Sequence, residues 1–384
     1  MLTKKINIWF SSSIVISLIV AVPILTVFLS FFENTTNYQE ILKNTFLIEY
    51  IFNSGVLLIG VLFLTFVIGT GTAYIVSFYK FPGVNFFKWA LILSFAVPPY
   101  IYAYSLVAFF ENYGTAFTIL KALFGEGTYN KSIPKFDGMF GAILSISFSL
   151  FGYVYILTRA SFFYQSQNLI EIGRNLGFSK IKSLFSIILP SARPAIIAGL
   201  SLVAMETLSD FGAVSFFGIN TLTTGIYDSW IAFDDLAFAN QLSFYLLIFI
   251  LALFILENYS RKKAKYHVPM KGGFRKKEKL NLKGINSFLA FIACFIVFFL
   301  SFIFPLSQMF YWTIIFPDNF YNLNIFELLF NTIYLVVISS LVLIIFSFIS
   351  NYGNRISNSR FLNLLTTFSV SGYAIPGVIL AVAF

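Results

Sequence analysis

The sequence has very few of the residues that form enzyme active sites or metal centres. It contains one cysteine, Cys294, and one histidine, His267, among 384 residues. A single cysteine excludes a disulfide framework and a cysteine metal site within one chain. His267 lies in a lysine-rich segment with no second ligand nearby, and the chain has no GxxxxGK(S/T) phosphate-binding loop. We therefore expect no metal ion or cofactor, and any ATP hydrolysis must take place on another subunit.

Charged residues are also scarce, at 11%, whereas 58% of the residues are hydrophobic and 51 are phenylalanine. So few charges cannot coat a globular surface, and the composition predicts an all-α integral membrane protein. The first apolar run is almost a full span and no small-x-small cleavage site follows it, which favours an uncleaved span over a signal peptide. The apolar segments predict nine spans, near residues 14–32, 55–79, 88–110, 139–163, 195–217, 236–257, 287–315, 330–350 and 361–384.

The basic residues indicate how these spans are oriented. With the N-terminus in the cytoplasm, all of the 25 lysines and arginines fall on the cytoplasmic side except for Lys43, Lys121, Lys131 and Lys135. Positive charge facing the cytoplasm is the usual orientation signal of membrane proteins. The net charge of +9 therefore reports membrane topology and not nucleic-acid binding.

Two halves of the chain repeat one another. The pair Asn53 and Ser54 recurs as Asn331 and Thr332, and Pro98 recurs as Pro376 at the same offset along the chain. The pattern predicts two parallel six-span units. We assign residues 1–258 to the first unit, 259–285 to a basic cytoplasmic linker and 286–384 to the first three spans of the second unit. The rest of that unit is expected to be missing from this sequence.

One long polar and basic segment, residues 168–194, interrupts the apolar first half. It reads NLIEIGRNLGFSKIKSLFSIILPSARP. Leu169, Ile170, Ile172 and Leu176 form an apolar stripe, which predicts an amphipathic helix on the membrane surface. A glycine at position 177 suits a sharp turn at a helix end. Pro190 and Pro194 are expected to end one helix and open the next.

The spacing of five residues in this segment resembles the "EAA" coupling loop of ABC importer permeases: Glu171, Gly177, Ile187, Leu189 and Pro190. The sequence departs from the family pattern at Ile172 and Gly173, where the family has two alanines. The resemblance implies a type I ABC importer permease fold, in which this loop is held by an ATPase subunit. Without it, the segment would be an interfacial helix with basic residues at the lipid headgroups.

The predicted fifth span contains two acidic residues, Glu206 and Asp210. Acidic residues within a span cost roughly 2.5–3.5 kcal/mol on insertion scales and are candidates for a transport pathway. Four residues apart, they are expected to share one helix face. Two carboxylates also suit a hard cation such as Fe³⁺. The alternative is that both residues pair with polar or backbone groups at a helix contact and never meet the substrate.

The stretch from Glu206 to Gly212, followed by Phe217–Gly218 and Thr223–Tyr227, resembles ferric-iron ABC importer permeases, which are fused two-unit proteins. Thiamine and aminoethylphosphonate permeases are rival assignments. The resemblance implies ATPase subunits on the cytoplasmic loops and a periplasmic binding protein on the external loops 111–137 and 218–235. The Gly/Thr-rich stretch 218–225 is a candidate gate or docking loop.

Two further classes of protein remain open. A secondary transporter could have the same six-plus-six repeat, but it would need no ATPase and would lack the Glu171–Pro190 pattern. An intramembrane enzyme could use Glu206 and Asp210, although the chain has no HExxH motif and no serine–histidine set. The resemblance favours a multi-pass inner-membrane permease, with lipid as its surroundings, that performs no covalent chemistry.

Overall fold

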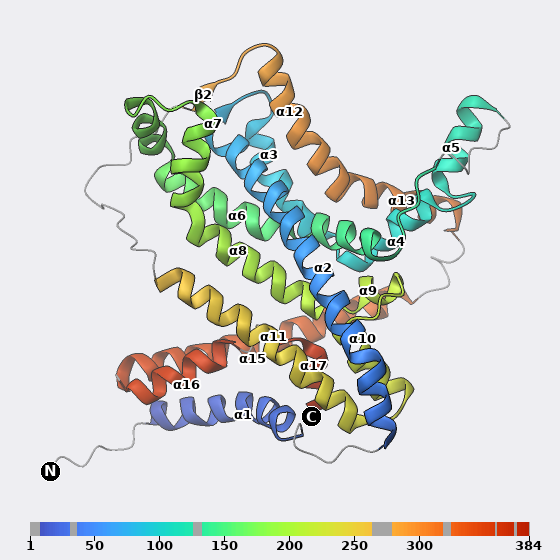
Figure 1. Cartoon of the computed structure of the whole chain (residues 1–384), viewed down its shortest axis with the longest axis vertical. Helices are drawn as coiled ribbons and strands as arrows, with labels where there is room; N and C mark the ends of the chain where they lie inside the picture. The colour runs from blue at the N-terminus through green and yellow to red at the C-terminus, as the bar shows by residue number, and fades with distance from the viewer. Residues whose placement is uncertain are drawn as a thin grey trace. The chain divides into compact units, whose positions relative to one another are not determined.

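The computed structural model describes residues 8–30, 37–125, 133–262, 279–317, 324–357, 359–371 and 375–383. Within these residues almost every element is helical (Figure 1). The long helices are α1 (Ile8–Ser30), α2 (Asn37–Phe78), α6 (Gly138–Asn175), α8 (Leu189–Ser209), α11 (Leu236–Lys262), α12 (Ile285–Phe298) and α15 (Ile325–Ser357). The shorter α-helices are α3 (Val84–Ala90), α4 (Pro99–Phe110), α5 (Thr115–Phe124), α7 (Lys180–Ser183), α9 (Gly212–Phe216), α10 (Leu222–Tyr227), α13 (Phe304–Ile315), α16 (Arg360–Ser371) and α17 (Gly377–Ala383).

The remaining elements are short. A 3₁₀-helix, η1 (Leu91–Ala96), follows α3, and three π-helical turns are η3 (Leu184–Ile188), η4 (Asp228–Ala232) and η5 (Phe299–Ile303). Two-residue strands β1 (Tyr79–Lys80) and β2 (Leu280–Asn281) pair in parallel, with Tyr79 opposite Leu280. An all-α membrane protein is thus confirmed.

Seven helices of the described residues are long and apolar enough to span a membrane, or eight if one bent pair counts as a single span. The predicted ninth span, 361–384, is not described throughout, so the prediction of nine spans stays a prediction. The predicted third span is bent by 91° between η1 and α4. The bend lies at Val97 and Pro98, because each precedes a proline and is thereby excluded from the helical conformation. The predicted ninth span likewise consists of two helices, α16 and α17, which flank Pro376.

The predicted internal repeat has a structural counterpart. The spanning parts of α2 (46–78) and α15 (325–357) are both 33 residues long. After each of them comes shorter helical structure, then a proline pair (Pro98 and Pro99) or a single proline (Pro376), and then a second helix. Those second helices, α4 and α17, begin at Pro99 and Gly377, which are separated by the same offset as Asn53 and Asn331. The unit boundaries given above stay a prediction.

The chain forms two compact units that do not coincide with the two repeats. One consists of residues 1–40, 226–247 and 310–384, and the other of residues 41–225 and 248–309. In the first unit, α1 packs along α15, α16 and α17, with the Trp9 ring 4.9 Å from that of Tyr352 (Figure 1). In the second, α12 and η5 pack against α3, η1 and α6. The first helix of each repeat therefore lies against helices of the other repeat.

The second unit is built around α6. Its core contains large buried aromatic side chains and the buried Cys294 of α12. On one side of α6, a Cβ at Gly69 of α2 would lie 2.7 Å from the Val154 Cβ, and on another a Cβ at Gly199 of α8 would lie 2.8 Å from the Val154 Cα. Gly69, on the second span, therefore packs closely against α6. Small residues let both neighbouring helices approach the α6 backbone.

Candidate functional site

The coupling segment folds as a helix end, a glycine turn and a second helix. Helix α6 continues to Asn175, and the chain reverses at Gly177, whose φ is +67°. The Phe178 N–H donates to the Gly173 carbonyl at 2.9 Å, and the Gly177 N–H donates to the Arg174 carbonyl at 2.9 Å. These two bonds form a Schellman motif, in which the residue with positive φ is preferentially glycine. The predicted turn at Gly177 is confirmed.

After the turn, the second helix packs tightly against the first. The Ser179 hydroxyl accepts a hydrogen bond from the Lys182 N–H at 3.3 Å and caps α7. A Cβ at Gly173 would collide with the Ser183 Oγ, so a residue without a side chain fits best there. Gly173, one of the two positions at which this sequence lacks the alanine of the family pattern, is therefore the point of contact between α6 and α7. Figure 1 shows α7 at the end of α8 that lies away from α9.

Pro190 opens α8 as expected, but neither proline ends a helix. Pro190 lies in the first turn of α8 and Pro194 inside it, and the π-helical turn η3 joins α7 to α8 without a break. A proline has no N–H for the ladder and its ring crowds the preceding turn, so the wider π turn absorbs the mismatch. A π-helical turn also precedes Pro305, where η5 continues into α13. The fifth span accordingly runs from Lys180 to Ser209 and not over 195–217.

The structure places the five motif residues along this turn. Glu171 lies in the last part of α6, and its side chain is outside the described set. Ile187 and Leu189 are half-buried on η3 and the start of α8, and Pro190 is exposed. Sequence reasoning missed two apolar side chains here, Ile181 and Phe185, which are 72% and 65% exposed. With the exposed Ile172 and Leu176, they form an apolar surface, which we call the coupling patch.

The other candidate residues, Glu206 and Asp210, lie near the opposite end of α8. They do not share a helix face, because α8 ends at Ser209 and Asp210 has extended backbone angles. The Asp210 Oδ1 accepts hydrogen bonds from the N–H groups of Ala213, at 2.9 Å, and Val214, at 3.2 Å. One carboxylate oxygen of Asp210 thus caps α9. The Glu206 Oε1 accepts from the Tyr153 hydroxyl at 3.4 Å.

The Gly/Thr-rich stretch beyond α9 is tied to the start of the second span. The side chain of Asn53 donates to the Asn220 carbonyl at 2.9 Å, and the Ser54 hydroxyl accepts from the Leu222 N–H at 3.0 Å. The Thr223 hydroxyl donates to the Leu208 carbonyl at 2.7 Å. Residues 221–225 are all buried. This arrangement suits a packed joint between α2, α8 and α10, while the exposed residues available for docking lie farther along, at Tyr227, Ile231 and Phe233.

The cap at Asp210 leads to a stability prediction. Asp210→Ala removes the acceptor for two backbone N–H groups and should destabilise the protein by about 0.5–2 kcal/mol. Asp210→Asn keeps a side-chain carbonyl that can accept both bonds, so it should retain nearly the full melting temperature. Thermal unfolding of both variants measures this difference. Equal melting temperatures for the alanine variant and the unchanged protein would contradict the capping role.

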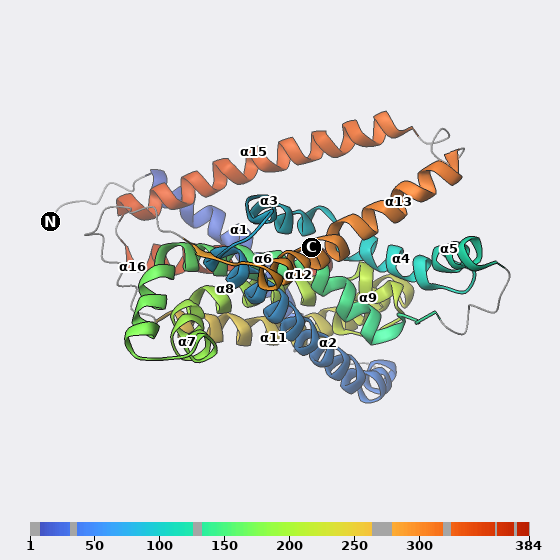
Figure 2. The ribbon, with the colours of Figure 1, turned by 90° about the horizontal axis from the view of Figure 1, so that it is seen from above.

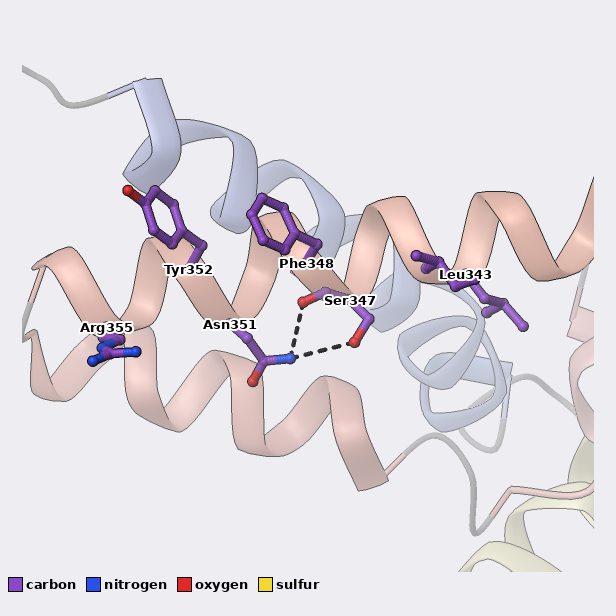
Figure 3. Close-up of a pocket in the computed structure, with 7 residues that line it drawn as sticks. Leu343, Ser347, Phe348, Asn351, Tyr352 and Arg355 are labelled. Atoms are coloured by element: carbon purple, nitrogen blue, oxygen red, sulfur yellow. Dashed lines mark hydrogen bonds between the residues drawn. The ribbon is translucent and has the colours of Figure 1, made fainter.

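A separate open groove lies on α15, lined by Leu343, Ile344, Ser347, Phe348, Asn351, Tyr352 and Arg355. Figure 3 shows Asn351 turned back onto its own helix, where its amide donates to the Ser347 carbonyl at 2.9 Å. The spanning part of α15, one unbroken helix in Figure 2, buries none of its apolar stretch within the described residues. In the internal repeat, Ser347 corresponds to Gly69, which packs against α6. We therefore interpret the groove as a helix-packing face and not as a ligand site.

Among the residues that the structure describes, no three or more histidine, cysteine, aspartate or glutamate side chains gather in a way that could hold a metal ion.

Comparison with known proteins assigns the family. Residues 66–265 match the family described as "Binding-protein-dependent transport system inner membrane component". The match contains the Gly177 turn, α8 and the packed joint at residues 221–225. The chain belongs to this family, whose members are ABC importer permeases, and it is a multi-pass inner-membrane transport component and not an enzyme.

Individual relatives differ in the substrates that their names give. The chain is 26% identical over 307 residues to the Fe(3+)-transport system permease protein FbpB 2 of Haemophilus influenzae, covering 79% of this chain and 55% of the relative. It is 25% identical over 159 residues to the sulfate transport system permease protein CysT of Salmonella typhimurium, covering 40% and 53%. A third relative, PhnU of Salmonella choleraesuis, is named for 2-aminoethylphosphonate transport and is 25% identical over 221 residues, covering 56% and 72%. The chain spans about half the length of FbpB 2 and CysT.

Proposed function

We propose that this chain is the membrane subunit of an ATP-driven importer that receives ferric iron from a periplasmic binding protein. The coupling turn carries the transport part of the proposal. It presents the exposed coupling patch beside Arg174, Lys180 and Lys182, and an apolar surface with a basic rim suits a protein partner better than water. We assign an ATPase subunit to this surface, with Glu171 and Gly177 at the contact.

The turn is also built to transmit force. Gly173 and Ser183 hold α7 against α6, and η3 joins α7 to α8 without a break. A displacement of α7 by the ATPase would therefore move α8 along its whole length, up to Glu206 and the joint at residues 221–225. In this mechanism the permease provides the transport path, and α7 and α8 transmit the motion of the ATPase to it. We place the N-terminus and the coupling turn in the cytoplasm, because almost all basic residues then face the cytoplasm.

Ferric iron is supported by the relative FbpB 2, which covers more of this chain than CysT or PhnU does. A carboxylate on the transport helix is compatible with transient contact to a hard cation. The substrate is tested by ATP-dependent uptake in proteoliposomes that contain the complete transporter and its binding protein. Stimulation by Fe³⁺-loaded binding protein is the expected result. Uptake of sulfate, 2-aminoethylphosphonate or thiamine in place of iron would overturn the iron assignment and leave the importer assignment intact.

The carboxylates Glu206 and Asp210 can be tested for a charge-based role in the pathway. Glu206→Gln combined with Asp210→Asn keeps size and hydrogen bonding while removing both charges. If a passing cation contacts the pair, we expect uptake to fall at least about tenfold, the equivalent of one 1.4 kcal/mol contribution to the transport barrier. The melting temperature should remain close to that of the unchanged protein. Normal iron uptake by the double variant would restrict both residues to helix packing and capping.

A further inference from the structure

Three basic side chains from distant parts of the sequence lie near the end of α2, the end of the spanning part of α6 (138–163) and the start of α12. Lys88 lies on α3, Arg159 on α6, and Lys279 directly before β2. The Arg159 guanidinium donates to the Lys88 carbonyl at 2.6 Å. The Tyr155 hydroxyl donates to the same carbonyl at 3.2 Å. This shared carbonyl holds α3 against α6 and places the backbone of Lys88 beside the Arg159 guanidinium.

Lys279 is brought to this site by the strand pair. Pairing of Tyr79 with Leu280 places the residue before β2 beside the end of α2, where its ammonium group donates to the Val76 carbonyl. Phe78 and Phe162 pack edge to face, with ring centroids 5.2 Å apart, and join the same end of α2 to α6. Burial, with smaller contributions from Lys88 and Arg159, lowers the pKa of Lys279 to about 8.

Nothing acidic balances these charges among the described residues. Lys88 donates to the Asn85 side-chain oxygen at 2.5 Å, and the Arg159 guanidinium contacts the Tyr155 side chain as well as the Lys88 carbonyl. Lys279 donates to the Val76 carbonyl. Carbonyl groups at a helix C-terminus offset only part of a full positive charge. A cluster of three cations so arranged stabilises a bound anion.

Aromatic side chains border the cluster and face outward. The Arg159 guanidinium lies 5.6 Å from the Trp89 ring centroid, and Trp89 is 70% exposed. Phe86 is 57% exposed and packs its ring edge to face with Phe298 of α12, at 5.4 Å. Tryptophan beside basic residues at the end of a span is typical of the headgroup level of a membrane.

We propose that Lys88, Arg159 and Lys279 bind the phosphate of an anionic phospholipid headgroup, with Trp89 and Phe86 against the upper part of its acyl chains. The exposed aromatic border favours a lipid over an acidic protein segment, because such a segment would leave these rings without an apolar neighbour. Basic pockets between membrane helices recognise anionic headgroups in this way. The site is separate from the coupling patch and does not depend on which substrate is transported.

The test measures thermal stabilisation of the purified, delipidated full chain in detergent during titration with phosphatidylglycerol or phosphatidylcholine. Phosphatidylglycerol should raise the melting temperature at lower concentrations than phosphatidylcholine. Each cation near a membrane surface contributes about 1 kcal/mol to the binding of anionic lipid, which corresponds to roughly a fivefold change. Lys88→Gln with Lys279→Gln should therefore raise the half-maximal phosphatidylglycerol concentration roughly 25-fold.

Two matched variants separate this site from general charge and packing effects. Lys180→Gln with Lys182→Gln removes the same charge from the coupling turn and should leave the lipid preference unchanged. Lys88→Arg with Lys279→Arg keeps the charge and should retain the preference. An undiminished preference in the double glutamine variant, or an equal loss in the coupling-turn variant, would overturn the proposal.

Two further arms identify the source of the anion. Glycerol phosphate at the same concentrations lacks acyl chains and should not reproduce the stabilisation; an equal effect would make the cluster a phosphate site and not a lipid site. If phosphatidylglycerol and phosphatidylcholine act alike, but the double glutamine variant loses retention of the ATPase subunit, the cluster binds a protein partner and the lipid proposal is wrong.

Discussion

Replacement of Gly177 by valine is expected to abolish ATP-dependent uptake. Gly177 has a φ of +67°, which a β-branched residue adopts only with strain, and the turn between α6 and α7 depends on that angle. The Schellman bonds to Arg174 and Gly173 would be lost or distorted, and α7 would leave its position against α6. We expect normal membrane insertion, retention of the ATPase subunit reduced at least about tenfold, and transport near background, since a shift of 1.4 kcal/mol already changes an equilibrium tenfold.

The matched variant is Gly177→Asn. Asparagine tolerates the left-handed conformation better than other non-glycine residues, so it should retain the turn and most of the transport activity. Co-purification of the ATPase and uptake are measured on both variants in the complete transporter. Full uptake and full ATPase retention in the valine variant would show that the turn does not couple the two subunits.

Gly199→Val is expected to have the largest effect on folding. A Cβ at this position would lie 2.8 Å from the Val154 Cα and 3.2 Å from the Tyr153 carbonyl oxygen. Both are backbone atoms of α6, so α8 can accommodate a side chain only by moving away from α6. Overpacking of a tight interior costs about 1–3 kcal/mol, and here the displaced helix also carries the coupling segment. We expect a melting temperature several degrees lower and a reduced yield of folded protein.

Gly71→Val is the control for Gly199→Val. Gly71 lies on α2, and a Cβ there would have no heavy atom outside its own helix within 4 Å. The same change in size and branching should therefore alter the melting temperature little. If both variants unfold at the same temperature, the close contact between α6 and α8 is not what limits stability, and the sensitivity to valine would come from helix propensity alone.

The coupling turn shows how far local sequence signals reach. A glycine, a polar run and the following prolines predicted the turn at Gly177, because a positive φ and a helix end are decided within a few residues. The same reasoning failed for Pro190 and Pro194, which it expected to end a helix. The structure retains the helix through η3, since a π turn can absorb the missing N–H groups when neighbouring helices hold both ends in place.

Glu206 and Asp210 show the opposite limit. Their spacing indicated a shared helix face, but α8 ends at Ser209 and the Asp210 carboxylate turns to the N–H groups of α9. The sequence alone cannot distinguish a carboxylate that caps the next helix from one that faces a transport path. The contact that Asn53 and Ser54 make with residues 220–222 could not be predicted from the sequence either, although Asn53 and Ser54 had indicated the internal repeat.

The sequence by itself determined the class of protein, the positions of most spans and the turn at Gly177, while the division into two repeated units stays a prediction. These properties depend on composition, on apolar runs long enough to span a membrane, and on glycine and proline acting on their immediate neighbours. Only the tertiary structure decided that α1 packs with α15 and α12 with α3 and η1, that Arg159 donates to the Lys88 carbonyl and that Lys279 donates to the Val76 carbonyl. Those contacts join residues far apart in the chain, and many apolar helix faces could satisfy the same local pattern, so packing complementarity alone selects among them.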